Sequence, residues 1–105
     1  MKVLINGDNQ IKVGEGLTSF VQGEVDRALG RFEDRLTRVE VYLSDLNGPK
    51  EGGTADKRCV IEARPAGRQP VAATADAVTV DEAIAESVNK MKRQLESALG
   101  REDKH

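Results

Sequence analysis

Apolar residues recur at helical spacing through the last quarter of the chain, from Thr79 to Leu99. The spacings of three and four place these residues on one face of an α-helix. Thr79 is a residue type favoured at helix N-termini, and Glu82 follows three positions later, so the pair predicts a capping box. Gly100 comes next, where a helix commonly ends. The apolar face is made of Val80, Ile84, Val88, Met91, Leu95 and Ala98.

A second helical pattern runs from about Glu15 to Phe32. Its apolar residues again repeat at spacings of three and four. Gly23 and Gly30 each cost a helix about 1 kcal/mol relative to alanine, so we expect a helix that frays near Gly30. The apolar stripe consists of Leu17, Val21, Val25, Ala28 and Phe32.

Four further segments have the composition or the alternation of β-strands. Residues Lys2 to Asn6 are short, apolar and β-prone, whereas Thr37 to Leu46, Asp56 to Arg64 and Gln69 to Ala75 alternate between inward and outward positions. Such alternation is typical of strands with one buried and one solvated face. Between the second and third strands, Asn47 to Ala55 is rich in glycine and predicts a loop.

The predicted order of elements is β-α-β-β-β-α, which indicates an α+β fold with a four-stranded sheet. The first strand, helix and second strand form a βαβ unit, so these two strands should be parallel. The second, third and fourth strands should form an antiparallel meander. Both helices should pack on one face of the sheet, because only one face of each alternating strand is apolar. We expect a single domain over residues 1–100, followed by a short charged tail at residues 101–105.

Composition narrows the class of protein without identifying it. The chain has 105 residues, with 16 basic and 18 acidic side chains and a net charge of −2. This balance differs from the basic character usual in nucleic-acid-binding domains, but a local basic patch remains open because the distribution of charge matters. There is one cysteine, no signal-peptide pattern, and no apolar run near the roughly 20 residues that span a bilayer. These features favour a soluble cytoplasmic protein.

The sequence offers no catalytic constellation. His105 is the only histidine and the last residue, so neither a catalytic triad nor a histidine metal site is expected. Cys59 falls on the inward face of a strand, where a small buried hydrophobe is expected rather than a nucleophile. Asp45, Asn47 and Asp56 flank the predicted loop at a spacing that fits turn formation better than calcium binding. We therefore expect a protein that is not an enzyme and that has no metal or cofactor.

Basic residues on the two predicted helices are the remaining candidates for a functional site. If the helices lie side by side on the sheet, their basic groups share one outer surface that a phosphate backbone can contact. The candidate residues are Arg27, Arg31, Arg35, Lys90, Lys92 and Arg93.

The alternative is an ordinary solvated helix surface, which charges alone favour. Glu24 stands near Arg27 in the first helix. In the last helix, Glu86 and Lys90, and likewise Lys92 and Glu96, have the i,i+4 spacing of helical ion pairs.

Three stretches of the sequence favour a binding surface over an ordinary solvated one: RLTRVEVYLSD, DKRCVIEARPAG and a last helix that contains KMKRQL. Together with the order of elements, they resemble the ribosome hibernation promoting factor and ribosome-associated inhibitor A family, whose domain is called the sigma-54 modulation or S30AE domain. The similarity spans nearly the whole chain and is to the short form. Glu24, Asp26 and Glu96 depart from the lysine-rich pattern of this family.

The resemblance implies a cytoplasmic protein that binds 16S rRNA in the decoding region of the small ribosomal subunit. Such a protein blocks the mRNA and tRNA sites and holds ribosomes inactive under stress. The matching basic positions are Arg27, Arg35, Lys90 and Arg93, with Arg31 and Lys92 as neighbours. No membrane or small-molecule substrate is implied, and we expect a monomer off the ribosome. Two alternatives stay open: a protein-interaction module with reduced rRNA affinity, and a general binder of double-stranded RNA.

Overall fold

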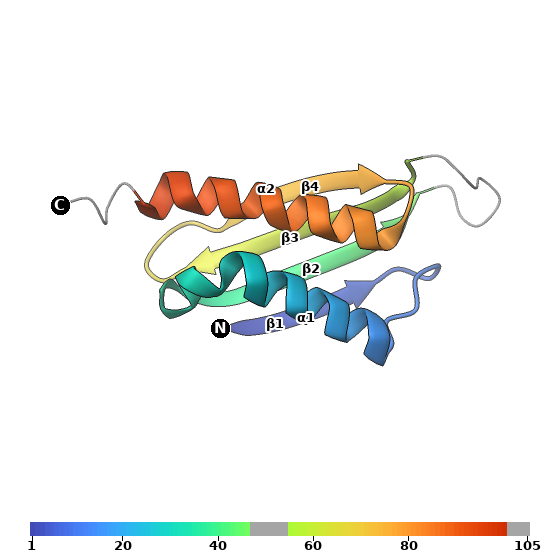
Figure 1. The fold of residues 1–105 in the computed structure, drawn as a ribbon, viewed down its shortest axis with the longest axis horizontal. Coiled ribbons are helices and arrows are strands. Elements are labelled where there is room, and N and C mark those ends of the chain that lie inside the picture. The colour runs from blue at the N-terminus through green and yellow to red at the C-terminus, as the bar shows by residue number, and fades with distance from the viewer. Residues whose placement is uncertain (47–54, 101–105) are drawn as a thin grey trace.

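The computed structural model describes residues 1–46 and 55–100, and within them it confirms the predicted order of elements (Figure 1). The predicted loop at residues 47–55, apart from Ala55, and the predicted tail at residues 101–105 lie outside the described residues. The elements are β1 (Lys2–Gly7), α1 (Glu15–Leu29), the 3₁₀ helix η1 (Gly30–Arg35), β2 (Leu36–Asp45), β3 (Lys57–Pro65), β4 (Val71–Ala77) and α2 (Val80–Gly100).

The four strands form one sheet in the order β1-β2-β3-β4. β1 and β2 are parallel, with Val3 opposite Val39, as the βαβ unit predicts. β2, β3 and β4 form the expected antiparallel meander. β4 begins at Val71, two residues later than the alternation indicated, so Pro70 precedes the strand. Proline has no N–H to give to the ladder, which explains why the regular pairing starts after it.

Both helices cover the same face of the sheet, α1 on the side of β1 and α2 across β3 and β4 (Figure 1). The opposite side, which we call the open face, carries no helix formed by the described residues (Figure 1). Alternate strand residues point under the helices and are buried, as their period of two predicts. The fully buried contributors from the strands include Val39, Val41, Cys59, Ile61 and Ala63.

The first helix is shorter than its apolar pattern predicted. α1 ends at Leu29, and the chain winds on as the 3₁₀ helix η1 from Gly30 to Arg35. Glycine lowers helix stability, and the tighter 3₁₀ winding is common at helix ends. Phe32 still reaches the core, where its side chain is 3% exposed. The apolar stripe therefore predicted the burial of Phe32 correctly but not the kind of helix that buries it.

The second helix has the predicted N-cap at Thr79 but only half of the predicted capping box, because the Glu82 carboxylate bonds to the Thr79 hydroxyl and not to the Thr79 backbone N–H. The Thr79 hydroxyl accepts the backbone N–H of Glu82 at 3.1 Å, and it also donates to the Glu82 carboxylate at 3.1 Å. The buried face of α2 is wider than predicted, because Ala83 and Ser87 are buried beside the apolar stripe. At the far end Leu99, rather than the predicted Ala98, is the fully buried residue.

Candidate nucleic-acid interface

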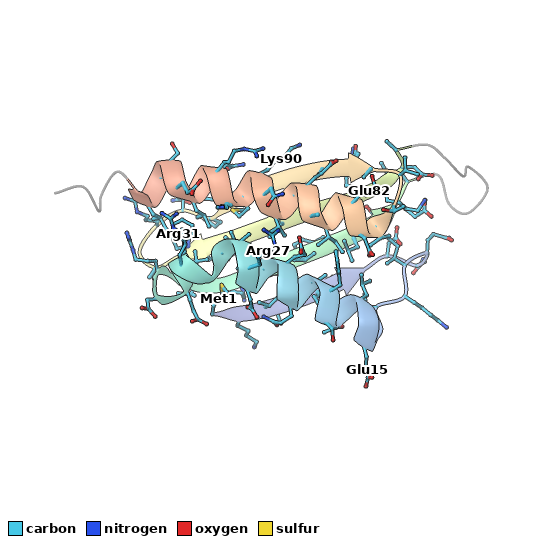
Figure 2. The ribbon with its side chains drawn as sticks, viewed as in Figure 1. Met1, Glu15, Arg27, Arg31, Glu82 and Lys90 are labelled. Atoms are coloured by element: carbon cyan, nitrogen blue, oxygen red, sulfur yellow. The ribbon has the colours of Figure 1, made fainter. Side chains whose placement is uncertain are left out.

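The six candidate basic residues lie on three elements that cover one face of the sheet, but they do not form one cluster. Arg27 is on α1, Arg31 and Arg35 are on η1, and the other three are on α2. Figure 2 shows Arg27 and Arg31 between the two helices. Lys90 lies on the opposite flank of α2, above β4 (Figure 2). The structure therefore divides the candidates between the region where the two helices lie next to each other and the outer side of α2.

Arg27 is paired with an acidic neighbour on its own helix. Its Nη2 lies 2.9 Å from Oε1 of Glu24, and its Nε lies 3.4 Å from Oε2, so both carboxylate oxygens face the guanidinium. This hydrogen bond raises the pKa of Arg27 above its ordinary value. The Arg27 side chain is 54% exposed, whereas that of Glu24 is only 19% exposed. The proximity of this pair was predicted from the sequence.

Arg31 is paired with a residue of the other helix, α2. Its Nη1 lies 3.1 Å from Oε2 of Glu96 on α2. The same guanidinium stands over the ring of Phe32, 4.7 Å from the ring centroid, within range of a cation–π interaction. The expected i,i+4 pairing of Lys92 with Glu96 is wrong, because Glu96 reaches η1 instead. Sequence spacing carries no signal for this pair, since its members stand 65 residues apart.

Lys90 makes its contact with the sheet. Its Nζ donates to the backbone carbonyl of Thr74 on β4 at 2.9 Å, and Gln94, one turn later, donates to the carbonyl of Ala72 at 3.1 Å. β4 is an edge strand, so these carbonyls have no neighbouring strand to bind. The expected pairing of Lys90 with Glu86 is therefore replaced by a contact with the β4 backbone.

Lys92 and Arg93 differ from the other candidates in having no described partner for their charge. Neither makes a hydrogen bond or an ion pair with any residue in the part of the chain that the structure describes. Arg93 is exposed on the outer side of α2 and lines, with Glu86, Asn89 and Lys90, a shallow hollow of about 180 Å³. Lys92 is half-buried. These two are the candidates whose charge is not taken up by a described neighbour.

Arg35 has a different setting from the other five candidates. It ends η1 and is half-buried, and its backbone carbonyl accepts the N–H of Ala66 in the turn after β3 at 2.9 Å. The residue thus joins the end of η1 to the β3–β4 connection.

The open face of the sheet also carries charge, but there it is internally matched. Arg58 makes two hydrogen bonds with Asp76 on the neighbouring strand, at 2.8 and 3.0 Å, and this lowers the pKa of Asp76. Arg64 lies 3.4 Å from Glu62, and Nε of Arg38 lies 2.9 Å from Oε1 of Glu40. Glu40 also accepts a hydrogen bond from the Tyr42 hydroxyl. On the open face, Arg38, Arg58 and Arg64 thus each lie beside an acidic side chain.

The structure confirms that Cys59 is buried. It is 0% exposed beneath α2, where Ser87 lies 3.0 Å from its sulfur. Burial raises the pKa of the Cys59 thiol to about 11, so little thiolate exists at neutral pH. Within residues 1–46 and 55–100, no group of three or more histidine, cysteine or acidic side chains is arranged to hold a metal ion. None of the described helices has the length and apolarity that crossing a bilayer requires.

Comparison with known proteins places this geometry in context. A family model described as sigma 54 modulation protein / S30EA ribosomal protein matches residues 3–102. A ribosomal subunit interface protein from Coxiella burnetii has a similar structure, with a TM-score of 0.79 at 12% identity over 95% of this chain and 99% of that one. The N-terminal domain of Thermus thermophilus Protein Y gives a TM-score of 0.73 at 20% identity, over 92% and 98%. No curated protein sequence matches. At these identities the structures establish a shared fold.

Proposed function

Because this chain belongs to the sigma 54 modulation protein / S30EA ribosomal protein family, we propose that it binds the small ribosomal subunit and holds ribosomes inactive. This is a family of ribosome-associated factors and not a known family of enzymes. In the proposal, residues 1–100 act as one domain in the cytoplasm. The domain contacts 16S rRNA in the decoding region and blocks the sites of mRNA and tRNA during stress.

The observation that carries the proposal is the family match over residues 3–102. Two features of the structure support it. The basic candidates lie on helical elements above one face of the sheet, and Arg93 and Lys92 have no described partner that neutralises them. Ribosomal RNA is met largely as a shaped phosphate backbone, so rigid helices that carry arginine and lysine suffice without base-specific contacts.

Sedimentation with 30S and 70S particles at rising salt tests the proposal. We expect the protein to pellet with both particles at low salt and to be released as salt rises. Four to six phosphate contacts predict a slope of roughly −3 to −5 in a plot of log affinity against log salt. Absence of pelleting at low salt would contradict ribosome binding.

A charge-reversal variant tests which surface binds. Lys92→Glu with Arg93→Glu should abolish pelleting, because it reverses the two cations that no described residue neutralises. Lys90 is left intact, since its bond to the Thr74 carbonyl gives it a structural role. The matched control is Lys2→Glu with Lys12→Glu, which makes the same change in net charge on β1 and on the loop after it. If the α2 variant pellets like the unmodified protein, the assignment of this surface is wrong.

The ion pairs of Arg27 and Arg31 favour a second candidate, a protein-interaction module on the same fold with reduced rRNA affinity. Such a module would not pellet with ribosomes and would bind a protein partner in a manner largely insensitive to salt. A general binder of double-stranded RNA is tested in the same assay. An isolated RNA duplex would then compete with 30S particles at comparable concentration.

A further inference from the structure

We propose that Glu24 and Glu96 compete with RNA phosphates for Arg27 and Arg31, and that these two carboxylates thereby set the affinity of the interface. The inference rests on the proposed function, since it concerns the same surface. It adds a mechanism of regulation: part of the basic charge is neutralised within the molecule until a polyanion displaces the carboxylates.

The geometry of the two pairs supports competition. Glu24 meets Arg27 with both carboxylate oxygens, at 2.9 and 3.4 Å from its nitrogens. Glu96 meets Arg31 with one oxygen at 3.1 Å, while the face of that guanidinium is over Phe32. The N–H groups occupied by the carboxylates are the groups that arginine uses to bind phosphate oxygens. A phosphate that arrives while the carboxylate stays in place brings two anions to one cation.

Exposure shows that the pairs can exchange. The side chains of Arg27 and Arg31 are 54% and 59% exposed, so a phosphate in solvent reaches them without unfolding. Exposed ion pairs are weak, so each carboxylate should lower affinity by only about two- to fivefold. The carboxylates therefore adjust binding and do not forbid it.

The basic residues consequently fall into two functional groups. Lys92 and Arg93 make no ion pair with a described residue and are available for a first electrostatic contact. Arg27 and Arg31 join only after they leave Glu24 and Glu96. Because Arg31 and Glu96 belong to η1 and α2, this exchange also breaks an ion pair that joins the two elements.

The test uses isosteric substitutions in the full chain. Glu24→Gln and Glu96→Gln remove the charges and keep the side-chain sizes, and the probe is the 30S particle at several salt concentrations. Each variant should bind about two- to fivefold more tightly, and the double variant about four- to twenty-five-fold. The control is Glu62→Gln, which removes a carboxylate 3.4 Å from Arg64 on the open face. It makes the same change in net charge and should leave affinity nearly unchanged.

Two further readouts separate competition from a general effect of charge. Each arginine that gains a phosphate contact should make the salt slope more negative by about 0.7 to 0.9. In addition, Glu96→Gln should lose its effect when Arg31 is replaced by Gln, because the carboxylate then has no arginine to occupy. Circular dichroism and thermal melting check that every variant is folded.

The outcomes distinguish this inference from the proposed function. Tighter binding of the double variant with a steeper slope supports the inference. Unmodified protein that pellets while the double variant binds no more tightly than Glu62→Gln overturns the inference and leaves ribosome binding intact. If no variant pellets at low salt, both proposals are overturned.

Discussion

The two helices cover the same face of the sheet but are stabilised in different ways. α2 has 21 residues and an N-terminal cap in which Thr79 and Glu82 bond to each other. α1 has 15 residues, and Gly14 at its N-cap provides no side-chain hydrogen bond. The C-terminal end of α1 passes into the 3₁₀ helix η1. Local interactions within the helix thus favour α2, whereas α1 depends more on packing against the rest of the molecule.

The same contrast extends to charge. Arg27 on α1 and Arg31 on η1 are paired with Glu24 and Glu96, whereas Lys92 and Arg93 on α2 are not paired with any described residue. The better stabilised helix therefore presents the more available cations. This teaches that the number of basic residues on a helix is a poor measure of its capacity to bind RNA, because the acidic neighbours of each one decide how much charge is available.

The largest expected effect is the loss of a core side chain from α2. Leu95→Ala should lower the free energy of unfolding by about 2–5 kcal/mol, because Leu95 is fully buried and its truncation leaves a cavity. Leu17→Ala on α1 should cost less, since Leu17 is only half-buried. Urea denaturation of both variants measures the difference. Equal losses would contradict the view that α2 is the better anchored helix.

A smaller effect is expected at the N-terminus of α2. Thr79→Ala should destabilise the protein by about 1 kcal/mol, because it leaves the N–H of Glu82 without the Thr79 hydroxyl. Thr79→Ser serves as the control, since serine keeps a hydroxyl at the cap. Thermal unfolding should show a lower midpoint for the alanine variant and little change for the serine variant.

An increase in stability is expected from a substitution in the middle of α1. Gly23→Ala should raise the free energy of unfolding by about 0.5–1 kcal/mol, because glycine is unfavourable inside a helix. A Cβ atom at Gly23 would meet nothing within 4 Å. The contrasting variant is Gly67→Ala, which should destabilise because Gly67 has a φ of 73° in the β3–β4 turn. If Gly23→Ala destabilises the protein, the low helix propensity of Gly23 is not what limits the stability of α1.

The smallest effect is expected from adding a side-chain cap at the N-terminus of α1, where Gly14 provides none. Gly14→Ser should stabilise the protein by a few tenths of a kcal/mol, because a serine hydroxyl can accept an N–H in the first turn. The position has extended backbone angles and room for a side chain. Gly14→Ala, which adds a side chain without an acceptor, separates capping from other effects of replacing glycine. If the two variants melt at the same temperature, the missing N-terminal cap does not limit the stability of α1.

The periodicity of the sequence was sufficient to predict the fold. Alternation located all three antiparallel strands to within two residues, and alternate residues of these strands, among them Val39, Val41 and Ile61, are buried as that pattern predicts. The ends of elements were less predictable because they depend on hydrogen bonds that side-chain periodicity does not encode. The glycine indicated that the first helix weakens near Gly30, but not that the chain continues from there as a 3₁₀ helix.

The candidate site was less predictable from the sequence than the fold. The pattern of residues identified six basic positions and the local partner of Arg27, since Glu24 lies one turn away. It assigned Lys92 to Glu96 because spacing along one helix is all that a sequence shows. Glu96 instead binds Arg31 on another element, and Lys90 binds a strand carbonyl. Partners of this kind depend on how helices pack, which is a property of the tertiary structure.

The contacts of Lys90 and Gln94 with β4 have a consequence for behaviour at high concentration. An uncovered edge strand is a template on which another chain can add a strand and begin to aggregate. Here the carbonyls of Ala72 and Thr74 are already occupied by side chains from α2. An incoming strand has to displace an ammonium group and an amide before it can pair with this edge. The two side chains therefore hinder a second copy of the molecule from adding a strand at the β4 edge.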